Sequence, residues 1–306
     1  MTFSKMASSC FAFIFISTFF ILGSCSDDNG NDNLPNNQYL LIPDNHFEQM
    51  LIDQGVDSDG TLNGQMLRED AEQVQRLDLN RNSHFGEIAD LTGIEGFSNI
   101  TFLSAAGQNL VDIDLSSNTQ LDTLYLQNNY LSTIDLSKNT DLIVIDVLVN
   151  ELTTISGLEQ ATRLKRLNLS YNYFEDFSIT NASIEHLLMS DNLLTSFDST
   201  GAPNLKSILL TTNQLSTVDF SSNPSLETLV ISNNALQNIG LENNPNLMYF
   251  YASSNQLNSL DVSQNTELID LRVDRNPDLS CIKIHSGQEI PSVSISEYQE
   301  LNEVCQ

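Results

Sequence analysis

The segment LYLQNNYLSTIDLSKNTDL, residues 124–142, carries a pattern that recurs along most of this 306-residue chain. A close variant, ILLTTNQLSTVDFSSNPSL, begins at Ile208, and another, FYASSNQLNSLDVSQNTEL, begins at Phe250. Side chains alternate along a strand, so Leu124 and Leu126 are predicted to point into a core while Tyr125 points outward. Repetition of this unit indicates a protein built by stacking similar coils.

Ten copies fit the pattern L-x-x-L-x-L-x-x-N-x-L, which resembles the leucine-rich-repeat consensus. The first copy starts at Val74 and is 26 residues long, and the others are 20 to 22 residues long. The resemblance implies a solenoid whose strands form one parallel sheet on the concave side. About ten residues remain after each turn, too few for a long helix, so short extended or 3₁₀ segments are expected on the convex side.

An Asn column follows the strands at the point where the chain must turn inside the solenoid. An Asn amide both donates and accepts hydrogen bonds, so it can satisfy backbone groups that the turn removes from water. Gln108 takes this position in one repeat, and we expect a local distortion there. The column consists of Asn82, Asn129, Asn150, Asn172, Asn192, Asn213, Asn234, Asn255 and Asn276.

The second half of the repeats carries two further polar columns. A second Asn recurs at Asn118, Asn139, Asn181, Asn223, Asn244 and Asn265. An Asp column on the convex side comprises Asp114, Asp135, Asp198, Asp219 and Asp261. These carboxylates either accept N–H groups of the turns or share a cation. Ser156, Ser178 and Gly240 interrupt the row, which favours the first interpretation, and no metal site is predicted.

Both ends of the repeat array, residues 74–280, need a cap that covers the terminal coil. For the N-terminal cap, residues 38–73, Asp44 is placed to begin a helix whose apolar face holds Phe47 and Met50, and Gly55 suits its end. The C-terminal cap, residues 281–306, is predicted to be closed by a disulfide between Cys281 and Cys305.

The N-terminus has the features of an export signal. FAFIFISTFFIL, residues 11–22, is too short to span a bilayer as a helix and is typical of a signal peptide, here residues 1–24. LGSC resembles a bacterial lipobox, which implies that Cys25 carries lipid. Lipidation would leave Cys281 and Cys305 free to pair with each other. Residues 25–37 hold few apolar side chains and are predicted to be a flexible acidic tether.

The segment LLIPDNHFEQMLIDQGVDSDGTLNG, residues 40–64, and the repeats that follow resemble secreted and surface leucine-rich-repeat proteins of Bacteroidota. More distantly, the repeats are similar to those of internalins. Membership would imply a curved solenoid that binds a partner through its concave face. Asp27 and Asp28 after Cys25 resemble the surface-export signal of lipoproteins in that phylum. An outer-membrane lipoprotein facing the cell exterior is therefore expected, held to the membrane only through its lipid.

Composition and motifs argue against several classes of function. The chain has 12 Lys and Arg against 40 Asp and Glu, a formal charge of −28, so nucleic-acid binding is not expected. DSDGTLNG, residues 57–64, fails the EF-hand spacing because Thr61 and Leu62 hold the fifth and sixth positions. Neither a phosphate-binding loop nor a catalytic motif is present, and His186 is interpreted as a surface residue. We predict neither enzymatic activity nor a cofactor.

The outward positions of the concave strands are the candidate binding surface. Four consecutive repeats expose apolar side chains there, and contiguous apolar patches tend to mark interaction sites. Improved packing between neighbouring strands is the alternative explanation. A protein partner is the first hypothesis, and a glycan stacked on the tyrosines is the second. The candidate residues are Leu188, Leu209, Val230, Tyr249 and Tyr251, with a second group at Phe102, Tyr125 and Val144.

Overall fold

The computed structural model describes residues 38–80 and 87–305. The predicted signal peptide, Cys25, the tether and Asn82 lie outside the described residues. Within the described ranges, no helix is long and apolar enough to cross a membrane.

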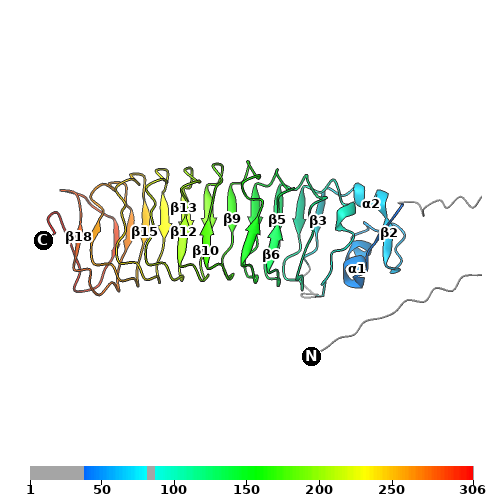
Figure 1. The fold of residues 1–306 in the computed structure, drawn as a ribbon, viewed down its shortest axis with the longest axis horizontal. Coiled ribbons are helices and arrows are strands. Elements are labelled where there is room, and N and C mark those ends of the chain that lie inside the picture. Colours follow the sequence, from blue (N-terminus) through cyan, green and yellow to red (C-terminus); the bar gives the residue numbers. More distant parts are fainter. Residues whose placement is uncertain (1–37, 81–86, 306) are drawn as a thin grey trace, which may run out of the picture. The chain divides into compact units, whose positions relative to one another are not determined.

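The front wall of the repeat array is one parallel sheet of eleven strands, paired in register between neighbouring coils (Figure 1). Ten strands come from the ten predicted repeats, and the eleventh, β19, comes from the predicted C-terminal cap. The strands are β3 (Arg76–Asp78), β4 (Phe102–Ser104), β5 (Thr123–Tyr125), β7 (Val144–Asp146), β9 (Arg166–Asn168), β11 (His186–Leu188), β13 (Ser207–Leu209), β14 (Thr228–Val230), β15 (Tyr249–Tyr251), β17 (Asp270–Arg272) and β19 (Ser292–Ser294).

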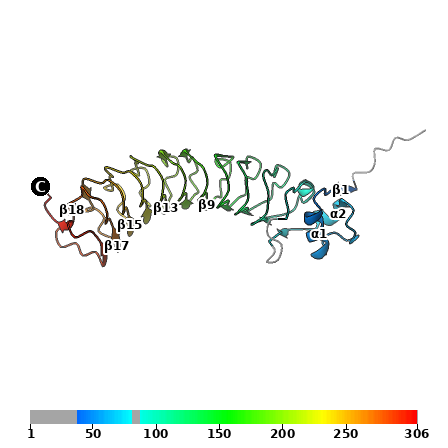
Figure 2. The same cartoon turned by 90° about the horizontal axis from the view of Figure 1, so that it is seen from below.

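The back wall is extended, as the length of the repeats predicts, but its strands form three separate parallel sheets. Figure 2 shows the curved stack with the front strands on its inner side. The single 3₁₀ helix of the described residues is η1 (Ile94–Gly96). The back strands pair as β6 (Thr133–Asp135) with β8 (Thr154–Ser156), β10 (Asp176–Ser178) with β12 (Ser196–Asp198), and β16 (Leu260–Asp261) with β18 (Cys281–Lys283) and β20 (Glu300–Asn302).

The core is a continuous column of aliphatic side chains between the two walls. Leu124 and Leu126 are both fully buried while Tyr125 is partly exposed, which confirms the predicted alternation. Leu167 and Leu169 repeat this arrangement two coils further on. Because such side chains fill closely packed space, replacing one with Ala would remove about 2–5 kcal/mol of stability. The predicted stacked solenoid is therefore confirmed.

The first Asn column forms a ladder that joins each coil to both of its neighbours. Asn150 Nδ2 donates to the carbonyl of Leu126 in the preceding coil at 2.9 Å and to Val147 O in its own coil at 3.1 Å. Asn150 Oδ1 accepts the N–H of Leu131 at 3.1 Å. Gln108 makes equivalent bonds, donating to Leu79 O at 3.0 Å and accepting the N–H of Ile88 at 3.2 Å. The distortion expected at Gln108 is therefore absent from the hydrogen bonding of this turn.

The second Asn column forms a parallel ladder along the opposite corner of the coils. Asn139 is fully buried, and its Nδ2 donates to Leu115 O at 3.0 Å and to Asn118 O at 2.9 Å. Near the C-terminus both ladders end on glutamine. Gln288 Nε2 donates to Asn265 O at 2.9 Å, and Gln299 Nε2 donates to Val273 O at 3.0 Å. At the last rung of each ladder, a glutamine amide therefore makes the hydrogen bond to the preceding coil that an asparagine makes elsewhere.

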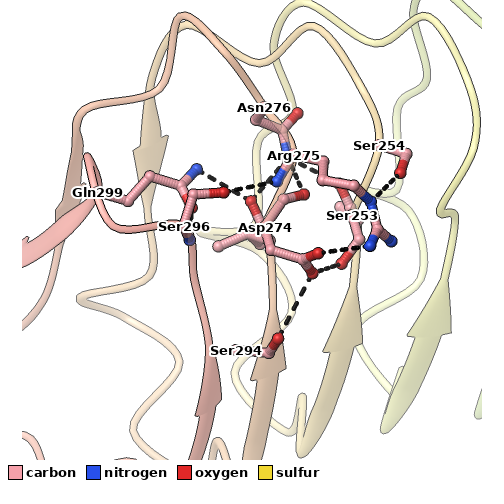
Figure 3. Close-up of polar contacts among 10 residues, drawn as sticks. Ser253, Ser254, Asp274, Arg275, Asn276, Ser294, Ser296 and Gln299 are labelled. Carbon is pink, nitrogen blue, oxygen red and sulfur yellow. Dashed lines mark hydrogen bonds and ion pairs between the residues drawn. The ribbon is translucent and has the colours of Figure 1, made fainter.

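Polar side chains also join the last three coils along the turns that follow the front strands (Figure 3). Arg275 Nε donates to Ser254 Oγ of the preceding coil at 2.7 Å, and the Arg275 backbone N–H donates to Ser296 Oγ of the following coil at 2.9 Å. Asp274 accepts hydroxyl hydrogen bonds from Ser253 and Ser294. The terminal coils are therefore held by side chains as well as by the sheet.

The N-terminal cap contains an antiparallel pair of β1 (Tyr39–Leu41) and β2 (Gln65–Leu67), helix α1 (Asn45–Asp53), which lies between them in sequence, and helix α2 (Arg68–Glu72). Asp44 begins α1 as predicted, with Oδ1 accepting the N–H groups of His46 and Phe47. Its second oxygen, Oδ2, accepts the N–H of Ala89 at 2.8 Å, which ties the cap to the first coils. Beyond α1, Gly55 takes a φ of 69°, a conformation that suits glycine.

A buried carboxylate holds the cap's loop against α1. The Glu48 side chain is fully buried, and its Oε1 accepts the N–H groups of Asn63, Gly64 and Gln65 at 2.8–3.1 Å. These three hydrogen bonds hold residues 63–65 of the cap against α1.

The C-terminal end is closed by the predicted disulfide. Cys281 and Cys305 are bonded, with their Cα atoms 5.7 Å apart and a sequence separation of 24. Because Cys281 begins β18, the bond ties the chain end to the back wall.

Candidate functional site

The predicted apolar row exists as one continuous column on the front wall. Leu188, Leu209, Val230 and Tyr251 are direct neighbours on β11, β13, β14 and β15, paired residue to residue. Each is partly exposed, so the column is neither core nor fully solvated. Tyr249 lies on the same strand and the same face as Tyr251. These five side chains form the concave patch.

A charged cluster closes the concave patch at its C-terminal end. Tyr251 Oη donates to Asp270 Oδ2 at 2.9 Å, and Arg272 forms an ion pair with the same carboxylate at 2.7 Å. The Arg272 guanidinium carbon also lies 4.4 Å from the centre of the Tyr251 ring, within cation–π distance. Burial, together with the bond to Asp270, raises the pKa of Tyr251, whereas the Arg272 bond lowers the pKa of Asp270.

The second predicted group is smaller and is only partly assembled. Phe102 and Tyr125 meet edge to face, with ring centres 5.7 Å apart, and the Arg76 guanidinium carbon lies 3.4 Å from the centre of the Phe102 ring. They line an open hollow of about 680 Å³. Val144 lies two strands from Phe102, beyond Thr123, so it stands apart from this pair.

Polar strands separate the two groups. Asp146 on β7 and Asn168 on β9 occupy the column between Tyr125 and Leu188. Seven of the eight predicted residues therefore form two groups on one face rather than a single patch, and Val144 belongs to neither group.

An ion-pair row lies beside the front strands. Glu185 accepts from Lys165 Nζ at 2.7 Å and from Lys206 Nζ at 2.8 Å, so one carboxylate bridges three neighbouring coils. The hydrogen bonds from Lys165 and then Lys206 lower the pKa of Glu185 to about 2. His186 begins β11 as a partly exposed side chain that makes no ion pair within residues 87–305.

The carboxylates of the convex Asp column accept N–H groups of the turns, which was the first of the two interpretations of the sequence. Asp135 Oδ1 accepts the N–H of Ser137 at 2.9 Å, and the same bond recurs between Asp219 and Ser221 at 2.8 Å. These backbone bonds lower the pKa of both carboxylates. In the described ranges, no group of three or more His, Cys, Asp or Glu side chains is arranged to hold a metal ion. The column therefore shapes turns.

The structure also exposes an apolar edge that the sequence reasoning missed. Five large side chains stand out beside the ladder turns, each at least 39% exposed: Tyr130, Val149, Tyr171, Tyr173 and Leu193. They occupy the positions immediately before or after the ladder Asn in adjacent coils. The sequence signal was available, because a large apolar or aromatic residue flanks the Asn in each of these repeats.

Comparisons with known proteins identify the fold. The chain matches no protein-family model and no curated protein sequence. Its structure is similar to the functional domain of InlJ from Listeria monocytogenes, with a TM-score of 0.70 and 22% identity. That likeness covers 88% of this chain and 64% of that one, so this chain spans less than two thirds of the InlJ domain.

Other solved structures agree with this assignment. A leucine-rich-repeat protein of Leptospira interrogans has a TM-score of 0.54 and 20% identity over 77% of this chain and 74% of its own. The LRIM1/APL1C complex has a TM-score of 0.52 and 22% identity, covering 76% of this chain and 46% of that one. The fold is a leucine-rich-repeat solenoid of the internalin-like kind.

Proposed function

We propose that this protein is a surface receptor or adhesin that binds a protein partner through the concave patch. The observation that carries the proposal is the unbroken apolar column Leu188–Leu209–Val230–Tyr251, which the core does not require and which remains open to solvent. Apolar side chains in the centre and charged groups at the rim are the usual arrangement of a protein-binding site. One structurally similar protein, LRIM1, is described as part of a complex with APL1C.

A glycan is the weaker candidate for this surface. Sugar stacking needs an accessible aromatic face, but Arg272 lies over the Tyr251 ring and Arg76 lies over the Phe102 ring. The Tyr251 hydroxyl is also bonded to Asp270. Leucine and valine, which make up most of the column, offer no planar platform.

Substitution within the column tests the proposal. Leu209→Asp and Tyr251→Ala are each expected to weaken partner binding by about 2 kcal/mol or more, roughly 30-fold in Kd, as at an interface hot spot. The far-UV circular dichroism should remain that of the parent because both side chains point away from the core. The measurement is quantitative mass spectrometry of proteins captured from extracts of neighbouring cells, with a glycan array run in parallel.

Ser216→Asp is the matched control, since it introduces the same charge at an exposed position away from the column. Its capture profile should equal that of the parent. Undiminished capture by both Leu209→Asp and Tyr251→Ala would exclude the concave patch. Selective binding on the glycan array that Tyr251→Ala abolishes would instead favour the glycan hypothesis.

We also propose that Cys25 carries a lipid that anchors the protein at the cell exterior. The LGSC motif supports this, and so does the pairing of Cys281 with Cys305, which leaves Cys25 without a partner among the cysteines that follow the signal peptide. Expressed in bacteria with its own N-terminus, the parent should fractionate with membranes and Cys25→Ser should not. Protease treatment of intact cells should digest the anchored form. A Cys25→Ser protein that remains in the membrane fraction would contradict lipidation.

A further inference from the structure

The back wall has a gap in the middle of the repeat array. Strands β7 and β9 pair directly on the front wall, but the back strands of the same two coils, β8 and β10, belong to different sheets. A hollow of about 460 Å³ lies between them, in the size range of ligand pockets. Its lining includes Thr154, Ile155, Leu158, Glu159, Asp176 and Phe177.

The gap has a cause in the sequence. The repeat that starts at Leu142 has 22 residues and the next, starting at Leu164, has 20, so one coil gains a residue and its neighbour loses one. Gly157 is the added residue, with a φ of 89°, and a Cβ there would clash with the backbone of Leu136 and Ser137. The longer coil thus packs closely against the coil before it.

Both strands that border the gap have a free edge. In a parallel pair, successive residues direct their N–H and C=O groups to opposite sides of the strand. Ser156 O accepts the N–H of Leu136 at 3.0 Å on the β6 side, and Ile179 N–H donates to Asp198 O at 3.0 Å on the β12 side. The intervening residues, Ile155 on β8 and Asp176 and Ser178 on β10, therefore direct their backbone groups toward the hollow. No strand covers them in residues 87–305.

The side chains around the gap specify the charge of an occupant. Glu159 and Asp176 line the hollow, and neither carboxylate forms an ion pair within the described residues. Beneath them Phe174 and Phe177 meet edge to face, with ring centres 5.6 Å apart. A second copy of this chain is a poor occupant because its formal charge of −28 would be repelled.

We propose that the gap between β8 and β10 binds an extended, basic peptide segment of a partner protein as an added strand. The segment's backbone pairs with the two free edges, an apolar side chain lies on Ile155 and Phe177, and a Lys or Arg lies between Glu159 and Asp176. Strand addition of this kind takes affinity from backbone hydrogen bonds and specificity from alternate side chains. The site lies on the wall opposite the concave patch, so it does not depend on the function proposed there.

The probe is a fluorescein-labelled peptide, Val-Lys-Val-Lys-Val with blocked ends, titrated into the purified protein by fluorescence polarisation. Saturable binding is expected with a Kd on the order of 0.1 mM, since the segment is short. Two analogues separate the contributions. Methylation of alternate backbone nitrogens blocks pairing with one of the two edges, Val-Glu-Val-Glu-Val reverses the charge, and each should weaken binding at least tenfold.

Asp176→Lys should also weaken binding of the basic peptide at least tenfold. Glu175→Lys is the matched control, because it makes the same charge change at the neighbouring exposed residue outside the hollow, and its Kd should stay within twofold of the parent. NMR shift changes on adding the peptide should concentrate in residues 153–159 and 174–180. The milder Asp176→Asn replaces Asp176→Lys if the latter alters the circular dichroism.

Three outcomes would overturn the proposal. These are an absence of saturable binding, equal affinity for the methylated peptide, which would mean capture by charge alone, and equal losses in Glu175→Lys and Asp176→Lys.

Discussion

At the residue scale, the turn into each ladder Asn depends on one backbone conformation. The residue before the Asn has a φ of 55–58° in eight coils, and in one further coil Gly107 takes this place with a φ of 72°. Left-handed geometry suits Asn and Gly and disfavours other side chains by about 1–2 kcal/mol. The eight residues are Asn128, Val149, Tyr171, Asp191, Thr212, Asn233, Ser254 and Arg275.

Val149 and Thr212 are the least suited of these residues because both are β-branched, with φ of 55° and 57°. Val149→Asn should raise the free energy of unfolding by about 1 kcal/mol, since the side chain is exposed and little burial is lost. The reverse change at an equivalent position, Asn128→Val, should lower it by a similar amount. Urea denaturation followed by circular dichroism measures both, and a neutral or destabilising Val149→Asn would show that the turn carries no strain there.

At the element scale, neighbouring coils interact through side chains that bridge strands. Glu185 is the clearest case, as its carboxylate lies between Lys165 and Lys206. Its pKa is lowered in the folded state, so the bridge stabilises the fold above the ordinary Glu pKa of 4.5 and loses that contribution as pH falls from there toward about 2.

Glu185→Gln should therefore lower the urea midpoint at pH 6 and leave it close to that of the parent at pH 2. Glu227→Gln is the control, because Glu227 holds the equivalent position before β14, two front strands after β11, and acts on Lys206 only at a distance, without an ion pair among the described residues. A difference between parent and Glu185→Gln that is independent of pH would exclude the ion pairs as its cause.

Elements also mark the limit of what the sequence could predict. The helix start at Asp44 and the inward Leu124 and Leu126 follow from local spacing, and the structure confirms them. The Cys281–Cys305 pair follows from the count of cysteines after the signal peptide, and it is confirmed as well. The gap between β8 and β10 could not be predicted from the sequence. The 22- and 20-residue repeats were visible, but repeat length alone does not say whether the front or the back strands lose their pairing. The concave patch was placed correctly on the front wall, but the cover of Arg272 over Tyr251 depends on side-chain conformation.

At the scale of the whole molecule, the array has nearest-neighbour connectivity, so its two ends control how it unfolds. The disulfide closes a loop with 24 residues of sequence separation, and removing it should cost about 2–4 kcal/mol. The loss should be local. In Cys281→Ser/Cys305→Ser, amide exchange should speed up in residues 281–305 and stay unchanged around Asn129. A uniform increase along the chain would mean that the array unfolds as a single unit.

The two asparagine ladders have a further consequence for how such a chain can change its length. The ladder asparagines of successive coils donate to equivalent carbonyls of the preceding coil, as Asn213 does to Met189 O and Asn234 to Leu210 O. One more 21-residue repeat, inserted directly before Leu226, could therefore form the same hydrogen bonds with the coils on both sides. Unequal recombination could thus extend or shorten the recognition face by one column at a time while both closed ends are inherited intact.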